Sequence, residues 1–184
     1  MNAEEEYLLG AFGDGYIDDK RHELFFHQKN LQWLELVNEL LQKNFGINGR
    51  ISKRDVYILR KKSKALVQKF RVLQKEEISD GKGFVAGLFD SEGSIYLSTK
   101  SKIPVVDITQ ASKGLESLKL AQQVLDKFRI KSHLNGPYNN KHGKLPQYHL
   151  RVYGFANCKM FCETFFIRHP DKLKKFSALT SKSG

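Results

Sequence analysis

The hydrophobic pattern of this chain switches several times between helical and strand-like spacing, and the series of switches occurs twice. In four segments apolar residues recur every three or four positions, which predicts amphipathic helices. Segments of alternating apolar and polar residues lie between them and predict strands. The predicted helices cover residues 30–45, 63–74, 112–128 and 154–167. The predicted strand regions are 16–28, 48–60, 94–110 and 131–154.

A more continuously apolar helix opens each half of this pattern. Residues 7–17 read Tyr-Leu-Leu-Gly-Ala-Phe-Gly-Asp-Gly-Tyr-Ile, and residues 84–95 read Phe-Val-Ala-Gly-Leu-Phe-Asp-Ser-Glu-Gly-Ser-Ile. Each helix therefore ends in an acid followed by glycine. Further matches follow at nearly constant spacing, which indicates one duplicated unit. The matching pairs are Asp14 and Glu92, Gln28 and Gln110, and Phe45 and Phe128, at offsets of 78, 82 and 83 residues.

The fold class predicted from this pattern is α+β, with two half-domains over residues 1–82 and 83–184. Each half runs helix, two strands, helix, two strands, helix. The strand over residues 148–154 places Leu150 and Val152 on one face and polar residues on the other. We therefore expect antiparallel sheets with helices packed on one face and a polar, basic face on the other.

The two acid-ended helices are expected to pack against each other. Ala86 and Gly87 are small residues in a bulky apolar run, which suits close helix contact. Gly15 and Gly93 are expected to end the helices in a left-handed conformation. Asp14 and Glu92 would then lie side by side at two negative helix ends, an arrangement that a cation between them would stabilise. Hard oxygen ligands favour Mg²⁺, which could activate water at a scissile phosphate.

The two helices do not align perfectly. When Asp14 is aligned with Glu92, Gly10 falls one position later than Gly87. One residue of slip rotates a helix by about 100°. Either Gly10 or Asp14 can therefore match its counterpart, and both can match only if the first helix is locally distorted. Asp90 is a competing carboxylate, but its spacing from Glu92 places it on another helix face.

The charge of the chain favours a polyanionic partner. Its 184 residues carry a net charge of +11, with basic stretches over 50–71 and in the half after residue 82. Charge alone leaves ribosome-like or nonspecific binding open. The first residues are acidic, and no apolar run is long enough to cross a membrane. We expect a cytoplasmic protein, or an organellar matrix protein if it is organelle-encoded.

At residues 85–93 the chain resembles the LAGLIDADG homing endonucleases, and residues 7–15 look like a weaker second copy of the motif. The resemblance to the single-chain, two-motif members spans almost the whole sequence. It implies a pseudo-twofold αββαββα fold whose sheets form a saddle over double-stranded DNA. It also implies a monomer that cuts both strands of a long, pseudo-palindromic site.

The resemblance also implies roles for individual residues. Asp14 and Glu92 would bind metal together with the backbone carbonyls of Gly13 and Ser91. Gln28 and Gln110 would order water or metal ligands, or else make ordinary groove contacts. Basic residues are expected near the scissile phosphates. The candidates are Lys174 or Lys172, with Lys75 as the counterpart in the first half.

Base-reading residues are expected on the polar sheet faces, where arginine can pair with guanine edges while lysine secures phosphates. The candidates are Arg50, Lys53, Arg54 and Arg60 in the first half, and Tyr96, Lys100, His149, Arg151 and Tyr153 in the second.

The sequence thus predicts a magnesium-dependent, sequence-specific double-strand DNA endonuclease. An intron-encoded protein is expected, since we find no motifs of a protein-splicing domain. Two alternatives remain open on the same scaffold. One is a maturase that binds intron RNA, and the other is a noncatalytic DNA-binding regulator; neither would need both acids.

Overall fold

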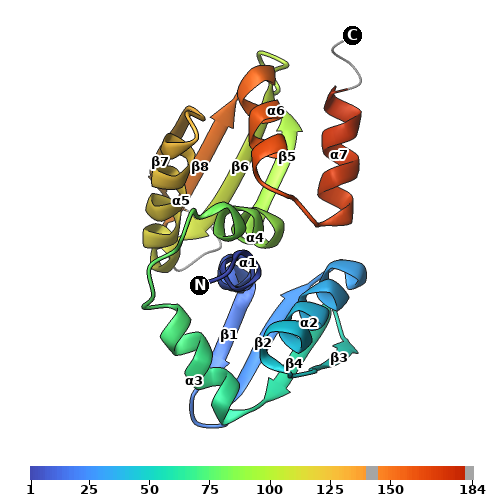
Figure 1. Cartoon of the computed structure of the whole chain (residues 1–184). Helices are drawn as coiled ribbons and strands as arrows, with labels where there is room; N and C mark the ends of the chain where they lie inside the picture. The colour runs from blue at the N-terminus through green and yellow to red at the C-terminus, as the bar shows by residue number, and fades with distance from the viewer. Residues whose placement is uncertain (140–144, 181–184) are drawn as a thin grey trace.

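Both halves of the chain form the same series of elements in the computed structural model (Figure 1). It describes residues 1–139 and 145–180, without the side chains of Asp14 and Thr180. The first half contains α1 (Ala3–Ala11), the 3-10 helix η1 (Phe12–Asp14), β1 (Gly15–Asp18), β2 (Glu23–Gln28), α2 (Leu31–Phe45), β3 (Arg50–Lys53), β4 (Tyr57–Lys62) and α3 (Lys64–Leu73). The second contains α4 (Lys82–Glu92), β5 (Gly93–Leu97), β6 (Pro104–Ala111), η2 (Ser112–Gly114), α5 (Leu115–Lys127), β7 (Ser132–Tyr138), β8 (Gln147–Tyr153) and α6 (Phe155–Thr164), followed by α7 (Pro170–Thr180).

The strands form two antiparallel four-stranded sheets with the same topology. Their orders are β1-β2-β4-β3 and β5-β6-β8-β7. The registers also agree, because Gln28 pairs with Tyr57 in the first sheet as Gln110 pairs with Tyr148 in the second. The predicted α+β fold with a duplicated αββαββα unit is confirmed. The final helix α7 was not predicted, since its sequence reads mainly as a charged run.

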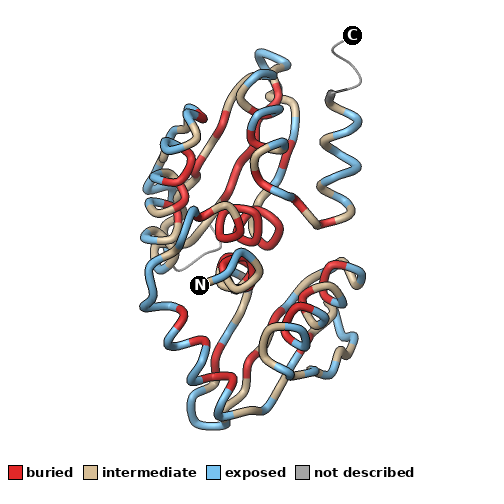
Figure 2. Tube along the Cα trace, viewed as in Figure 1, coloured by how far each residue is buried: buried red, intermediate tan, exposed pale blue. Residues whose placement is uncertain are grey.

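Helices cover only one face of each sheet. Helices α2 and α3 pack on the first sheet, and α5 and α6 pack on the second (Figure 1). The strand residues that point towards these helices are buried and apolar. They include Leu24, Phe26, Leu59, Val106, Ile108, Leu150 and Val152. Figure 2 shows buried segments along the inner strands. The alternate residues lie on the opposite face, which none of the described helices covers.

Helices α1 and α4 lie side by side at the centre of the molecule, between the two sheets (Figure 1). Glycines allow their backbones to touch. A Cβ atom at Gly87 would lie 2.0 Å from the carbonyl oxygen of Tyr7, and one at Gly10 would lie 2.0 Å from that of Phe84. The predicted close helix pairing is confirmed, and Gly87 is one of the residues that permit it.

The expectation of a left-handed glycine at the end of each motif helix is wrong. Gly15 has φ −93° and ψ 160°, and Gly93 has φ −84° and ψ 160°, so both are extended and begin strands. Glycine is needed at these two positions because a side chain would overlap a neighbouring aromatic ring. A Cβ at Gly15 would lie 2.1 Å from the Phe12 ring, and one at Gly93 would lie 2.2 Å from the Phe89 ring.

No helix in the described part of the chain has the length and apolar character that crossing a bilayer requires.

Candidate functional site

The two motif helices end next to each other and next to the inner strands. Glu92 is the last residue of α4, and Asp14 is the last residue of η1. The Cγ atom of Glu92 lies 3.1 Å from the position that a Cβ would take on Gly13. The half-buried Glu92 side chain therefore lies against the backbone immediately before Asp14. The side chain of Asp14 is outside the described part of the structure.

A tighter helical turn explains how Asp14 and Gly10 can both match their counterparts. From Gly87 to Glu92, five α-helical steps rise about 7.5 Å. From Gly10 to Asp14, one α-helical step and three 3-10 steps also rise about 7.5 Å, with about 40° less rotation. The 3-10 helix η1 is thus a local distortion that lets both residues match, and it compensates for the missing residue.

Gln28 and Gln110 occupy equivalent positions near the ends of β2 and β6. Both lie on the helix-covered face of their sheets, because they share that face with the buried residues two positions earlier in the same strand. The Gln110 amide lies beside the motif end, because its Nε2 atom is 3.0 Å from the position of a Cβ on Gly13. Gly13 and Gln110 also line a common cavity, which places polar groups around the motif end.

Asp90 lies away from this centre and has a structural environment. Its side chain is fully buried, and Oδ2 accepts hydrogen bonds from the Tyr7 hydroxyl at 2.7 Å and from the backbone N–H of Arg168 at 2.7 Å and His169 at 3.2 Å. Burial raises the pKa of the Asp90 carboxyl, although these hydrogen bonds oppose the shift.

The three candidate lysines lie in different environments. The Lys172 ammonium donates hydrogen bonds to the backbone carbonyls of Phe89 and, at 2.7 Å, Asp90, so it lies at the C-terminal end of α4. A cation is favoured there by the helix dipole. Lys174 on α7 and Lys75 after α3 are exposed.

The uncovered face of the first sheet carries Arg50 and Arg60, which are direct partners across β3 and β4. Other candidates are placed differently from the expectation. Lys53 shares the opposite face with Ile51, and its ammonium lies 5.3 Å from the Tyr57 ring centre. Arg54 lies in the bend between β3 and β4, because the strands end earlier than the charge pattern suggests.

The uncovered face of the second sheet carries most of the candidates of that half. Tyr96, His149, Arg151 and Tyr153 all lie on it, whereas Lys100 lies in the turn between β5 and β6. In both sheets the candidates at turns were misplaced for one reason: charge alone does not distinguish a strand from the turn beside it.

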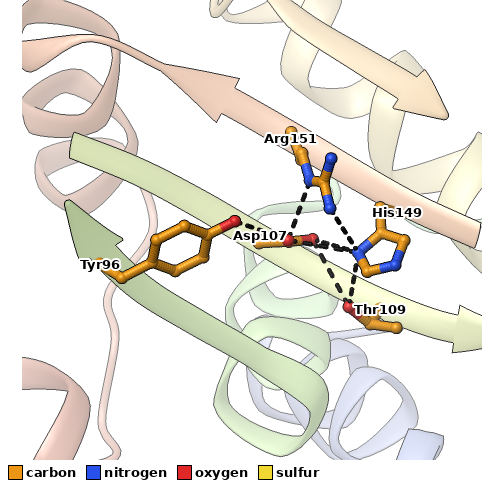
Figure 3. Close-up of polar contacts among 5 residues, drawn as sticks. All are labelled: Tyr96, Asp107, Thr109, His149 and Arg151. Atoms are coloured by element: carbon orange, nitrogen blue, oxygen red, sulfur yellow. Dashed lines mark hydrogen bonds and ion pairs between the residues drawn. The ribbon is translucent and has the colours of Figure 1, made fainter. Parts of the chain in front are cut away.

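The centre of this second face is a polar cluster that sequence reasoning missed (Figure 3). Asp107, with its side chain only 6% exposed, accepts a hydrogen bond from Arg151 Nε at 2.9 Å and from the Tyr96 hydroxyl at 3.1 Å. His149 Nδ1 lies 3.0 Å from its other oxygen. The alternation of Asp107 and Thr109 with buried Val106 and Ile108 is the signal that could have found it.

Burial and the neighbouring Asp107 carboxylate raise the pKa of Tyr96, which keeps its hydroxyl protonated as a donor. Burial by itself would lower the pKa of Arg151. The hydrogen bond and the charge of Asp107 outweigh burial, and the net shift of the Arg151 pKa is upward.

A duplicated sheet pair with two acid-ended helices between the sheets defines a LAGLIDADG-type scaffold. Residues 2–74 and 81–165 match the family model of the LAGLIDADG-like domain. The chain therefore belongs to this family.

Known proteins similar to this chain include one sequence relative and solved structures of the same fold. ATP-dependent DNA helicase Hel308 of Methanocaldococcus jannaschii is 31% identical over 201 residues, a match that covers 94% of this chain but only 16% of that protein. The structure of I-DmoI in complex with DNA and Ca has a TM-score of 0.69 at 20% identity and covers 97% of both chains. Full-length DUF199/WhiA from Thermotoga maritima has a TM-score of 0.65 at 18% identity, over 100% of this chain and 62% of that one. At these identities the structural matches show a shared fold.

Proposed function

We propose that this chain is a metal-dependent, sequence-specific endonuclease that cuts both strands of duplex DNA. The observation that carries the proposal is the position of Glu92 beside Gly13, which brings the Glu92 side chain to the backbone that precedes Asp14 at the end of the first motif. With one acid from each motif, such a centre has a separate carboxylate for each of the two DNA strands. Solved structures similar to this chain include the homing endonuclease I-DmoI, one of them in complex with DNA and Ca.

The donor groups at the motif ends fit a hard divalent cation. Glu92 and the backbone carbonyls of Gly13 and Ser91 offer oxygen only, and Asp14 adds a second carboxylate by sequence. We assign the metal site to these four residues. Bound Mg²⁺ would lower the pKa of a water molecule and offset charge on the leaving oxygen. No cluster of three or more acidic, histidine or cysteine residues suited to metal occurs among the residues that the structure describes.

Other residues at the centre have supporting roles in this proposal. Gln110, which lies against Gly13, would orient the attacking water, and Gln28 would do so in the first half. Lys172 would stabilise the end of α4 that presents Glu92. Lys174 and Lys75 stay predicted phosphate contacts.

DNA binding is assigned to the uncovered faces. Because the two sheets share topology and register, they would contact two similar half-sites, which suits a long, pseudo-palindromic target and a monomeric protein. Arg50, Arg60, Tyr96, His149, Arg151 and Tyr153 are the proposed groove contacts. Lys53, Arg54 and Lys100, at a strand end or in turns, are proposed to contact phosphates.

The test is cleavage of a randomised duplex DNA library in Mg²⁺ by the wild-type chain, Asp14→Asn and Glu92→Gln. The control is Glu163→Gln, which removes an exposed carboxylate from α6 on the helical side. We expect discrete double-strand cuts by wild type and control, and nicks or no cuts by the two motif variants while binding persists. Selective DNA binding without cutting by wild type would favour the regulator. Binding of structured intron RNA in preference to duplex DNA would favour the maturase.

A further inference from the structure

The uncovered face of the second sheet contains a buried negative charge in a surface proposed to bind a polyanion. Asp107 lies on β6 between β5 and β8, and its side chain is 6% exposed. Removing a carboxylate from water is costly unless it is paired and hydrogen-bonded. Asp107 meets this condition through donors from both neighbouring strands, Tyr96 on β5 and Arg151 on β8.

Asp107 has little capacity left to read DNA itself. Its Oδ2 atom accepts from Arg151 Nε at 2.9 Å and from Tyr96 at 3.1 Å. Its Oδ1 atom lies 3.0 Å from His149 Nδ1 and 3.5 Å from the Thr109 hydroxyl. Its carboxylate is directed sideways into the cluster, as Figure 3 shows. Its effect on DNA must therefore act through its neighbours.

Arg151 is the neighbour with free capacity. A guanidinium has five N–H groups. The Nε–H is used by Asp107, Nη2 lies 3.2 Å from His149 Nδ1, and a further side-chain hydrogen bond links Arg151 with Tyr153. Two of the five N–H groups remain for the two acceptors of a guanine edge, the preferred partner of arginine in the major groove. The bond to Asp107 thus fixes the plane of the guanidinium without occupying the edge that reads a base.

The duplication provides a natural comparison. Asp107 pairs with Arg151 at the register position where Phe25 pairs with Arg60 in the first sheet. Arg60 is exposed, whereas Arg151 is half-buried. The two halves therefore hold equivalent arginines, one of which is anchored by a carboxylate, whereas the cross-strand partner of the other is a phenylalanine.

We propose that Asp107 is a positioning residue that orients Arg151 for base reading in the second half-site, at the expense of nonspecific attraction to DNA. The inference rests on the proposed function. An ordered arginine loses less side-chain freedom when it binds a base. The paired carboxylate also offsets the charge that would otherwise attract phosphate. Specificity and nonspecific affinity should therefore change in opposite directions when Asp107 is altered.

The main variant is Asp107→Asn, compared with wild type, Arg151→Ala and Glu163→Gln. The last of these makes the same change in net charge on an exposed helix. Binding is measured by titration in Ca²⁺ with three DNA probes. The probes are the duplex that wild type selects from a random library, its single-base-pair variants and mixed-sequence duplex.

For Asp107→Asn we expect a loss of about tenfold in discrimination at the base pairs that Arg151→Ala also affects, with little further loss when Asp107→Asn and Arg151→Ala are combined in one chain. Affinity for mixed-sequence duplex should rise, and the slope of log K against log salt should steepen by about one. Glu163→Gln should leave discrimination unchanged. A purely structural role would instead lower both affinities and the melting temperature.

Arg151→Lys keeps the charge and tests the proposal even if Asp107→Asn does not fold. It should lose discrimination at the same base pairs while its salt slope stays that of wild type. The proposal is overturned if Asp107→Asn or Arg151→Lys retains wild-type discrimination there. Selective binding without cutting by wild type would refute the nuclease assignment and leave this inference standing, whereas a wild type without selective binding would refute both.

Discussion

The hydroxyl of Tyr7 donates a 2.7 Å hydrogen bond to Oδ2 of Asp90, a residue 83 positions later in the chain. The same hydroxyl accepts a hydrogen bond from Trp33 Nε1 at 2.8 Å. Asp90 in turn accepts from the backbone of Arg168 and His169. One buried chain of hydrogen bonds therefore joins α1, α2, α4 and the segment before α7, so both halves and the C-terminal region depend on it.

Tyr7→Phe should lower the free energy of unfolding by about 1–3 kcal/mol, because the Trp33 indole N–H loses its buried acceptor and Asp90 loses a donor. Urea unfolding measures this free energy, with tryptophan fluorescence as the signal. The signal comes from the site itself, since Trp33 is the chain's one tryptophan. Tyr16→Phe is the control, because Tyr16 is 59% exposed, and it should leave stability within error. Equal stability of the two variants would contradict the prediction.

Gly87→Ala should destabilise the chain by about 3 kcal/mol or more, because the new Cβ would lie 2.0 Å from a backbone oxygen that cannot move aside. Gly46→Ala is the matched control. Gly46 has φ +67° and open space around it, so only backbone strain of about 1 kcal/mol is expected there. Chemical denaturation of both variants separates steric overlap from conformational strain. A smaller loss at Gly87 than at Gly46 would show that the helices do not pack this closely.

Lys172→Met should lower stability by about 1–2 kcal/mol, because the carbonyls of Phe89 and Asp90 lose a charged donor at the end of α4. Lys174→Met should have no measurable effect on stability, since Lys174 is exposed. If Lys174 contacts phosphate as predicted, its variant loses DNA affinity instead. Thermal unfolding and salt-dependent DNA binding of the two variants distinguish the roles, and identical profiles would refute this division.

Most of the fold was predictable because it depends on local patterns that occur twice. Helical and alternating spacing indicated the element order, and the slip between Gly10 and Gly87 left open whether Gly10, Asp14 or both match, which η1 decides in favour of both. The conformation of Gly15 was not predictable in this way, since it depends on where the Phe12 ring lies.

In the candidate site, too, contacts between side chains could not be predicted from local patterns. Asp107 was missed because its partners, Tyr96 and Arg151, are 11 and 44 residues away and meet it only across strands. Lys172 and Lys174 could not be separated by sequence, because their difference arises from the path of the chain beside α4. Local periodicity assigns a residue to a face, but contacts between distant segments decide what it does there.

His169 should make the chain lose stability as the pH falls. Burial, with a smaller contribution from the charge of Lys172, lowers the pKa of this histidine to about 4. The unfolded chain takes up the proton at about pH 6.5. The contribution of His169 to the free energy of unfolding is therefore fully present above pH 6.5. It decreases as the pH falls towards 4, by about 3 kcal/mol in total.

His169→Phe tests this dependence, because an aromatic ring keeps the packing against Trp33, where the ring centres are 5.9 Å apart. Urea unfolding of wild type and variant at intervals from pH 7 to pH 4 should give a difference that shifts in favour of the variant as the pH falls. Burial raises the pKa of Asp90, so its contribution to the pH dependence of stability has the opposite sign. This contribution is the same in wild type and variant and cancels from the difference. Parallel pH profiles would show that His169 is protonated as readily in the folded chain as in the unfolded one.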